Sequence, residues 1–329
     1  MFSLLPTPPV PTLLLLLLLS LSPLLFLLPD LSLFRPATAP VPPSSSSSPK
    51  IAFLFLTNSP LTFSPIWQLF FSNASSPHLY NIYVHSDPSI PIPNNTPPFT
   101  HERFIPSIKT QRHTPTLISA ACRLLTKALQ HDRHNAFFAL ISQHCIPLHS
   151  FTYLHNTLFH RRSADRVDYY RSFIQVESND TFMPNRYNAW GENVLLPEVP
   201  FNRFRMGSQF FVLTRRHAVV ATRDLRLWRK FRLPCDLDID SCYPEEHYFP
   251  TLLSMEDAEG CAGYTLTRAN WTDSVEGHPH TYEKGEVSPE LIYKLRESDF
   301  SQDYLFARKF SPDCLDSLLS ISESVIFRD

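Results

Sequence analysis

Short runs of continuous apolar residues recur along the chain after residue 50, and stretches with helical spacing separate them. The runs are Lys50–Leu56, Tyr80–His85 and Ala136–Ile141. Unbroken apolar character is typical of strands buried on both faces, as in a parallel sheet. Apolar residues repeat at helical spacing in the intervening Ile66–Phe71 and Thr116–Leu129. This alternation predicts an α/β fold, in which helices flank a mostly parallel sheet on both faces.

Polar residues follow each of these predicted strands. Thr57–Asn58, His85–Asp87 and Ser142–Cys145 come at their carboxyl ends. Parallel sheets bind their ligands outside the carboxyl ends of the strands. We therefore expect these three turns to lie close together and to form part of a binding site.

The middle of the chain carries weaker patterns. Arg161–Arg205 is rich in Arg, Asn, Tyr and Trp. Polar groups beside aromatic residues such as Trp190 suit a sugar-binding lip, but an irregular surface loop has the same composition. Beyond it, Gly207–Leu213 predicts a further strand, and Thr214–Lys230 predicts a basic helix.

An acidic stretch, Cys235–Pro250, follows that helix. Pro244 fits the first position of a helix, because the N–H that proline lacks would be unpaired there anyway. Glu245 and Glu246 then fall in the first turn, where the positive end of the helix dipole favours carboxylates. A carboxylate held at the edge of a sheet can act as a general base, although acids in a first turn also serve as ordinary caps.

The chain closes with a strand-like run, Tyr304–Phe310, and a short helix, Cys314–Ser320. The run places Arg308 and Lys309 side by side. Adjacent cations are usually solvated, but the apolar residues that precede this pair favour a directed role.

The N-terminus predicts a membrane segment. Residues 12–34 are almost wholly apolar and include seven consecutive leucines, Leu13–Leu19, and about 20 apolar residues can cross a bilayer as a helix. A cleaved signal peptide and an uncleaved signal anchor are both compatible with this run. Its length and the lack of a clean small-residue cleavage site favour the anchor. Residues 1–11 would then be a short cytosolic tail, residues 35–49 a Pro/Ser-rich stem, and residues 50–329 the folded domain.

Composition excludes several classes of protein. The formal net charge is −2, so nothing indicates a nucleic-acid partner. The chain has 6 glycines and no Gly-rich phosphate loop, which argues against a dinucleotide or P-loop site. The 6 cysteines lack C-x-x-C spacing, which argues against zinc, and some of them would form disulfides in an oxidising lumen. Four N-glycosylation sequons fit a luminal location: Asn73, Asn94, Asn179 and Asn270.

Seven runs of the domain carry a family resemblance and occur in order between about residues 50 and 310 of the sequence. They are Ile51–Pro60, Tyr80–Ser86, Phe138–Leu148, Met206–Leu213, Ser241–Thr251, Trp271–His280 and Leu305–Phe310. Together they resemble the plant branch of the core-2/I-branching β-1,6-N-acetylglucosaminyltransferase family. The resemblance implies a GT-A-type fold and an inverting, metal-independent transfer of sugar from a UDP-sugar, with no cofactor.

The resemblance also implies roles for single positions. Glu246 stands where the family has its catalytic base, and Lys309 where it has a lysine that binds pyrophosphate. Arg308 is the proxy for a second pyrophosphate-binding cation. His85 stands at the position that contacts the nucleoside in relatives, and Asp87 can substitute for it.

Further contacts are expected next to these positions. Thr57, at a strand end, is predicted to bind the donor, and Glu245 and Trp190 are predicted to bind the acceptor. A Trp-Gly-acid motif typical of the family before the first long helix is missing, and the chain has Gln111–Pro115 there instead.

The resulting hypothesis is a single-pass type II enzyme of the Golgi membrane, anchored by residues 12–34. It would transfer a sugar, above all N-acetylglucosamine, to a glycan or glycoprotein in the lumen. A glucuronosyltransferase and a catalytically silent carbohydrate-binding or scaffold protein remain alternatives. Asp238-Ile239-Asp240 has the form of a metal-binding Asp-x-Asp motif, but it follows the basic helix rather than the second or third strand, so no metal site is predicted.

Overall fold

The computed structural model describes residues 48–75, 77–91, 96–159, 170–235, 242–272, 274 and 277–329. The predicted tail, the predicted anchor and nearly all of the predicted stem lie outside these residues. Within the described ranges, no helix combines the length and apolar character that crossing a membrane requires.

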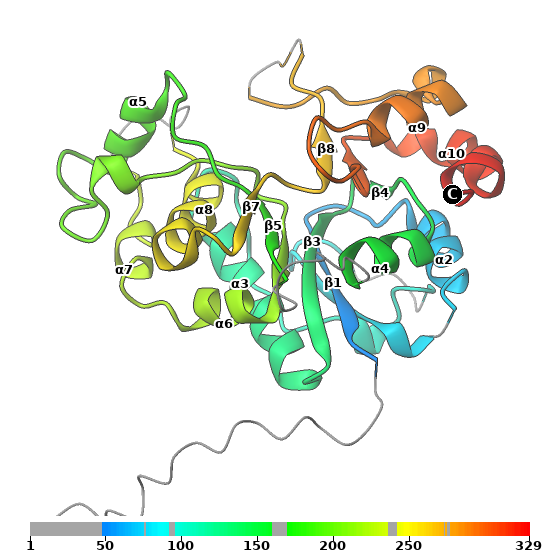
Figure 1. The fold of residues 1–329 in the computed structure, drawn as a ribbon, viewed down its shortest axis with the longest axis horizontal. Coiled ribbons are helices and arrows are strands. Elements are labelled where there is room, and N and C mark those ends of the chain that lie inside the picture. Colours follow the sequence, from blue (N-terminus) through cyan, green and yellow to red (C-terminus); the bar gives the residue numbers. More distant parts are fainter. Residues whose placement is uncertain are drawn as a thin grey trace, which may run out of the picture. The chain divides into compact units, whose positions relative to one another are not determined.

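The predicted strands of the first half form one side of the central sheet (Figure 1). β1 (Lys50–Thr57) pairs in parallel with β2 (Tyr80–Ser86) on one edge and with β3 (Asn135–Ser142) on the other. All three predictions of strands in this region are confirmed. The alignment of the three strands brings their carboxyl ends to the same edge of the sheet.

The other side of the sheet departs from the mostly parallel arrangement that was predicted. In the described part of the chain, the strand order is β2-β1-β3-β6-β5-β7, with β5 at Ser172–Gln175, β6 at Val212–Thr214 and β7 at Cys261–Gly263. β6 runs antiparallel to both β3 and β5, whereas β5 and β7 are parallel. The central sheet is therefore mixed.

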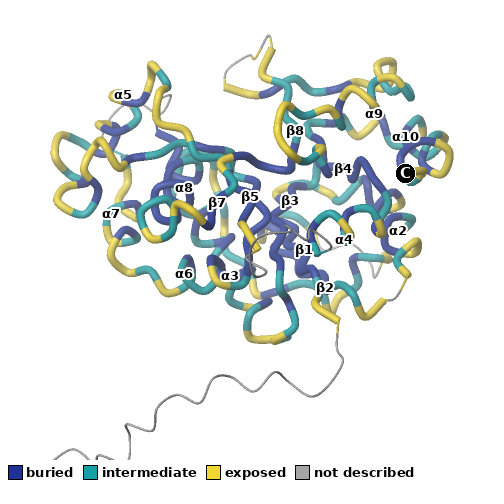
Figure 2. The backbone as a smooth tube through the Cα atoms, in the orientation of Figure 1, coloured by how far each residue is buried: buried dark blue, intermediate teal, exposed yellow. Residues whose placement is uncertain are grey.

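Alternate residues of β1 explain why helices cover both faces of the sheet. Ile51, Phe53 and Phe55 belong to one hydrophobic core, and Ala52 and Leu54 belong to the other. The first core includes residues of α2 (Ser64–Ser72) and α4 (Phe151–Phe159). The second includes residues of α3 (Thr116–His131), α6 (Arg215–Arg223) and α8 (Pro244–Asp257). Figure 2 shows the strands as the most buried layer.

A second, three-stranded sheet brings the C-terminal run close to the central one. Its order among the described residues is β4-β9-β8, with β4 at Ile146–Pro147, β8 at Thr267–Ala269 and β9 at Phe306–Arg308. β4 follows β3 after a short turn, so β9 lies next to the carboxyl end of β3. The strand predicted at Tyr304–Phe310 is thus present but shorter.

The remaining helices are short. α9 (Pro289–Arg296) and α10 (Leu315–Ile321) lie near the C-terminus, and α10 continues into a π-helical turn, Ser322–Ile326. α10 follows a 3-10 turn, Pro312–Cys314, so the predicted final helix begins slightly later than expected. Other 3-10 turns are Pro77–Leu79, His101–Arg103, Phe201–Arg203 and Lys284–Glu286.

The predicted basic helix is divided in two. α6 ends at Arg223, and a separate α7 spans Trp228–Phe231. Asp224 is the C-cap residue of α6, and its carboxylate stabilises the turn to α7 by accepting hydrogen bonds from the main-chain N–H groups of Arg226, Leu227 and Trp228 at 3.0, 3.1 and 2.9 Å.

The region that gave only weak signals in the sequence holds regular structure as well. It contains β5 and α5 (Met183–Asn188).

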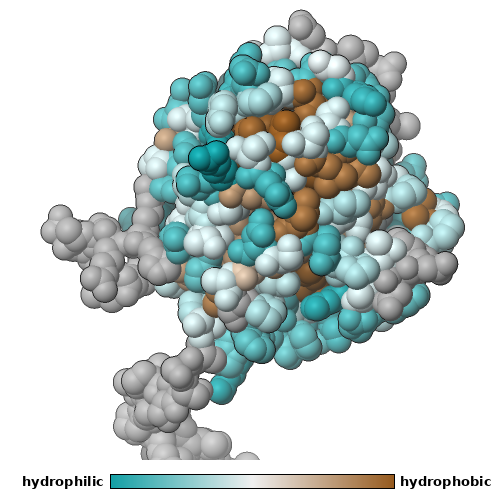
Figure 3. Space-filling model, turned by 90° about the vertical axis from the view of Figure 1, so that its right-hand side faces the viewer, coloured by the Kyte–Doolittle hydropathy of each residue, from teal (hydrophilic) through white to brown (hydrophobic). Residues whose placement is uncertain are grey.

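Figure 3 shows another side of the domain, next to α9 and α10, where apolar patches lie among hydrophilic residues. Tyr293 and Phe300 are exposed aromatic residues of this C-terminal part. Single exposed apolar side chains are normal on folded domains.

Candidate active site

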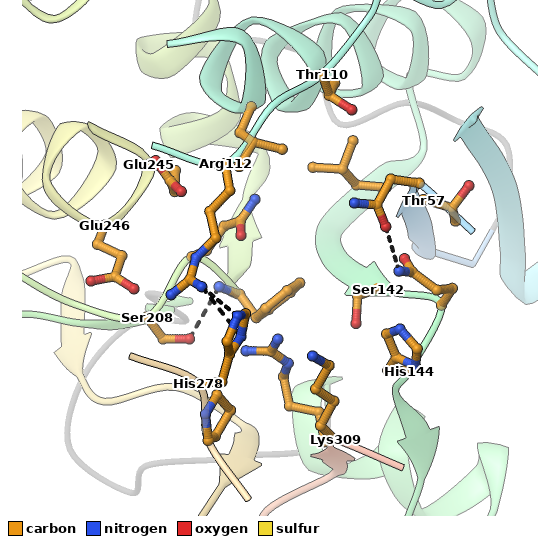
Figure 4. Close-up of a pocket in the computed structure, with 18 of the residues that line it drawn as sticks. Thr57, Thr110, Arg112, Ser142, His144, Ser208, Glu245, Glu246, His278 and Lys309 are labelled. Atoms are coloured by element: carbon orange, nitrogen blue, oxygen red, sulfur yellow. Dashed lines mark hydrogen bonds between the residues drawn. The ribbon is translucent and has the colours of Figure 1, made fainter. Parts of the chain in front are cut away.

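A cavity of about 210 Å³ lies at the carboxyl ends of β1 and β3, between the first turn of α8 and the end of β9 (Figure 4). Most of the rest of its wall comes from three loops, which contain residues 110–112, 208–210 and 277–279. It is lined by Leu56, Thr57, Asn58, Thr110, Gln111, Arg112, Leu117, Ser142, Gln143, His144, Ser208, Gln209, Phe210, Glu245, Glu246, Trp271, Gly277, His278, Pro279, Arg308 and Lys309. The sequence placed ligand binding at this edge of the sheet, and the cavity opens there.

Glu246 lies on the side of the cavity formed by α8. Pro244 occupies the start of this helix, so Glu245 and Glu246 fall in its first turn, as the sequence predicts. Oε2 of Glu246 accepts a hydrogen bond from Nη1 of Arg186 at 2.8 Å, and its side chain is 23% exposed. The N–H of Gly207 donates to the carbonyl of Glu246 at 2.9 Å. Both the main chain and the carboxylate of Glu246 are therefore fixed in position while the side chain stays accessible.

Glu245 has a different environment in the same turn. It is 4% exposed, and its Oε2 has no hydrogen-bond partner among the described residues. Burial raises the pKa of Glu245 to about 8, and the neighbouring charge of Glu246 adds to the rise. A hydrogen bond from the main chain of His113 acts in the opposite direction. At neutral pH the side chain of Glu245 is mostly a neutral carboxylic acid.

Arg308, the last residue of β9, and Lys309, which follows it, also line the cavity, and Figure 4 shows Lys309 across the cavity from these acids. The guanidinium carbon of Arg308 is 4.5 Å from the centre of the Phe210 ring, and Nε of Arg308 has no partner in the described part of the chain. Burial lowers the pKa of Lys309, and the charge of Arg308 lowers it further. Burial and then Lys309 also lower the pKa of His144. A cluster of cations kept from water in this way attracts a polyvalent anion.

Arg112 is a third cation of the cavity that the sequence analysis did not single out. Its guanidinium donates to the carbonyl of Gly277 and to Nε2 of His278, both at 2.6 Å, and lies 5.6 Å from the centre of the Tyr243 ring. It therefore joins the segment before α3 to the loop that follows β8. Arg112 belongs to the segment that replaces the family's Trp-Gly-acid motif, which is the signal that could have drawn attention to it.

The neighbour of Arg112 in that segment has an unusual backbone. His113 has φ 64°, in the left-handed region that favours glycine. Its ring lies 4.6 Å from the Tyr243 ring, and its Nδ1 donates to the carbonyl of Cys242 at 3.1 Å. Cys242 forms a disulfide with Cys235, so a covalent bond closes the loop that leads into α8. Cys122, Cys145, Cys261 and Cys314 are not bridged.

Of the strand-end residues predicted to bind the donor, Thr57 lines the cavity. His85 and Asp87 are buried and are not among the lining residues identified in the described chain. Nε2 of His85 accepts from the N–H of Ile108 at 3.1 Å, and Oδ2 of Asp87 accepts from the N–H of Thr110 at 2.6 Å. Both side chains therefore support the segment that carries Thr110 and Arg112 into the wall. A donor contact by either side chain remains a prediction.

Asp87 is ionised in this supporting position. Burial opposes the charge, but hydrogen bonds from Ser89 and Thr110 hold the pKa of Asp87 below its usual range. The same hydrogen bonds occupy both carboxylate oxygens.

Trp190, predicted as an acceptor contact, is 3% exposed and belongs to the hydrophobic core. Its indole N–H donates to the carbonyl of Leu233 at 3.2 Å, and its ring lies 5.3 Å from the ring of Phe231. The sequence showed an aromatic residue among polar ones but not the direction of its side chain. In this structure Trp190 presents no exposed face to a sugar.

The remaining predicted sites differ in accessibility. Asn73 and Asn179 are exposed, and Asn270 is half-buried next to Trp271 of the cavity wall. Asn94, Asp238 and Asp240 lie outside the described residues. Glycosylation of the sequons remains a prediction.

Comparisons with known proteins complete the description of the site. The family model of the core-2/I-branching enzyme matches residues 51–296. The glycosyltransferase BC10 of Oryza sativa subsp. japonica is 28% identical to this chain over 291 residues, which cover 79% of this chain and 68% of the rice protein. The matched family region includes Glu245 and Glu246 and ends before β9.

Proposed function

The chain belongs to the core-2/I-branching enzyme family of glycosyltransferases, and we propose that it moves N-acetylglucosamine from UDP-N-acetylglucosamine to a glycan acceptor. The transfer would invert the anomeric centre and would need no metal ion. One observation carries the proposal: an accessible carboxylate, Glu246, and two cations, Arg308 and Lys309, line the same cavity at the carboxyl ends of β1 and β3.

This arrangement fits a single in-line displacement. Glu246 takes the proton from an acceptor hydroxyl as its oxygen forms a bond to the anomeric carbon of the donor. The bond from that carbon to the diphosphate oxygen breaks, and UDP leaves with the electron pair. Because the attack and the departure occur on opposite faces of the sugar, one base is sufficient and the product is inverted.

Fixed cations can stabilise the charge that grows on departing UDP. The Arg308 guanidinium remains charged even where burial opposes its charge, and Lys309 follows it in the chain. Together they would take the place that a divalent ion has in metal-dependent transferases. Thr57 and Asn58, at the end of β1, would lie against the nucleoside part of the donor.

The location we propose is the Golgi membrane, with the catalytic domain in the lumen. The apolar run of residues 12–34, the stem that follows it and the exposed sequons at Asn73 and Asn179 support this location. The disulfide between Cys235 and Cys242 fits an oxidising compartment as well.

The test is a donor screen with the full-length protein purified in detergent. Release of UDP from UDP-N-acetylglucosamine, UDP-glucuronic acid, UDP-galactose and UDP-xylose is measured with water alone and with a panel of plant glycans. We expect turnover of UDP-N-acetylglucosamine above the other donors when an acceptor is present. A protein that binds UDP and glycans but turns over none of the donors would instead be a carbohydrate-binding member of the family.

A further inference from the structure

The carboxyl group of Glu245 is a buried polar group that the proposed reaction does not use. It lines the cavity, is 4% exposed, and its Oε2 has no hydrogen-bond partner in the described part of the structure. A buried oxygen without a hydrogen-bond partner destabilises a folded protein. Such a group at the wall of a cavity is explained when a ligand supplies the missing hydrogen bond.

The position of Glu245 shows which part of a substrate would meet it. The diphosphate would bind at Arg308 and Lys309, and the attacking hydroxyl at Glu246, so the transferred sugar lies between them. Figure 4 shows Glu245 on the same side as Glu246, across the cavity from Lys309. Glu245 is also more buried than Glu246, whose side chain is 23% exposed. Trp271, which also lines the cavity, is 53% exposed, so an acceptor glycan would enter on this exposed side and the buried Glu245 would face the donor sugar.

We propose that Glu245 acts as a neutral carboxylic acid that donates a hydrogen bond to a hydroxyl of the transferred sugar, next to a Glu246 carboxylate that disfavours a charged sugar. The inference rests on the proposed function, because it needs a UDP-sugar in this cavity. It departs from the acceptor contact that the sequence suggested for Glu245. A protonated carboxyl both donates and accepts, which matches a sugar hydroxyl.

Charge disfavours a uronic acid as the transferred sugar. The Glu246 carboxylate adjoins Glu245 in the same turn, so a uronate in the sugar position would meet a carboxylate. Burial favours the neutral form of Glu245 and raises its pKa to about 8. The charged and titratable groups around this end of the cavity are Glu246 of α8, Arg186 of α5, Arg112 and His113 before α3, His278 of the loop beyond β8, Arg308 at the end of β9 and Lys309 directly after it.

The test compares binding of UDP, UDP-N-acetylglucosamine and UDP-glucuronic acid to the full-length protein by calorimetric titration. The variants are Glu245→Gln, which keeps a neutral donor, and Glu245→Ala, which removes it. Each is titrated well below and well above pH 8. Glu290→Gln is the matched control, because Glu290 also follows a proline at the start of a helix but is exposed on α9. Thermal unfolding verifies that each variant is folded.

We expect Glu245→Ala to weaken UDP-N-acetylglucosamine binding about 5-fold at the lower pH, the equivalent of one neutral hydrogen bond. UDP binding should be the same in all variants. The unmodified protein should lose the sugar-dependent affinity as pH rises through about 8, when Glu245 ionises, whereas Glu245→Gln should keep it. The Gln variant retains every other titratable group, so the difference isolates Glu245.

The outcomes separate this inference from the proposed function. If neither UDP nor any UDP-sugar binds, the proposed function and the inference fail together. If UDP-N-acetylglucosamine binds and Glu245→Ala has no effect on it, only the inference is overturned. The inference is also overturned if Glu245→Gln binds UDP-N-acetylglucosamine as weakly as Glu245→Ala does. It is overturned as well if UDP-glucuronic acid binds at least as tightly as UDP-N-acetylglucosamine.

Discussion

Two neighbouring carboxyl groups, Glu245 and Glu246, differ in exposure and in hydrogen bonding. Glu246 is accessible and paired with Arg186, whereas Glu245 is buried and lacks a partner for one oxygen among the described residues. A base must reach the proton that it takes, so the accessible group suits that role. The buried one suits recognition, because a hydrogen bond is strongest where water is excluded.

The first residue prediction concerns the anion site. Lys309→Ala should weaken UDP binding about 10- to 100-fold, the usual value of one charge-assisted hydrogen bond, and should slow the reaction as well. The measurement is a titration with UDP. Lys294→Ala is the control, because Lys294 is an exposed lysine of α9 and should bind UDP like the unmodified protein. Equal UDP affinity in Lys309→Ala would remove this residue from the donor site.

The same cations lead to a prediction on metals. If Arg308 and Lys309 stabilise the leaving diphosphate, the initial rate of transfer should be unchanged by an excess of EDTA. Adding Mn²⁺ or Mg²⁺ afterwards should produce no increase. A rate that EDTA abolishes and Mn²⁺ restores would point to Asp238 and Asp240 as metal ligands.

The positions of site residues that follow strong structural signals could be predicted from the sequence. Thr57 comes after a long buried strand, and Glu245 and Glu246 follow a proline that begins a helix, so their positions could be predicted. Arg112 was not predicted, because no periodic pattern marks the segment before α3 and only the missing Trp-Gly-acid motif distinguishes that segment. Trp190 shows the complementary limit, since composition does not reveal whether a side chain points to the core or to solvent.

At the level of elements, the first turn of α8 is fixed by a close approach of two chain segments. Gly207 donates its N–H to the carbonyl of Glu246. A Cβ on Gly207 would lie 2.1 Å from the carbonyl oxygen of Gln175 in β5. Only glycine lets the chain pass between β5 and α8 at this distance, so the position of the Glu246 main chain depends on this residue.

Gly207→Ala should therefore displace the first turn of α8, since the clash is with backbone that cannot rotate away. We expect a loss of at least about 2 kcal/mol in the free energy of unfolding, typical of severe local overpacking, or a lower rate in a protein that still folds. Urea unfolding and initial rates measure both. Gly285→Ala is the matched control, because a Cβ there meets no atom within 4 Å. If Gly207→Ala and Gly285→Ala have the same free energy of unfolding and the same initial rate, Gly207 does not constrain the first turn of α8.

Element length decided what the sequence could predict of the fold. β1, β2, β3, α3 and α4 are long enough for apolar runs or helical spacing to stand out. β7 and β8 have three residues each, which is too short for a periodic pattern. β6, also three residues long, overlaps only the end of the strand predicted at Gly207–Leu213. The direction of these three strands depends on tertiary pairing, so the mixed character of the sheet was not visible in the sequence. The turn between α6 and α7 is stabilised by hydrogen bonds to the Asp224 side chain, which no periodic pattern in the sequence marks.

At the scale of the whole molecule, residues Ser48–Asp329 form a compact unit of their own. The only run in the sequence with the length and apolar character of a membrane helix, residues 12–34, precedes this unit. The predicted layout is therefore a catalytic unit tethered through a stem.

This layout predicts how the protein fractionates. The full-length chain, expressed in a secretory host, should sediment with membranes and resist extraction by carbonate at high pH. A chain that begins at Lys50 and is preceded by a cleavable secretion signal should be secreted. Immunoblots of the membrane and medium fractions measure both. If the shorter chain stays in the membrane fraction, residues 12–34 are not what anchors the protein.

The central claim is that Glu246 is the base of a UDP-sugar-dependent transfer, and the most direct measurement compares Glu246→Gln with the unmodified protein. Initial rates are measured with UDP-N-acetylglucosamine and the best acceptor of the screen, and UDP affinity by titration. Because glutamine keeps the size of the side chain but does not take the proton, kcat should fall about 10²- to 10⁴-fold while UDP affinity stays the same. Glu256→Gln, on the exposed face of the same helix, should leave both unchanged. A kcat for Glu246→Gln near that of the unmodified protein would contradict the account.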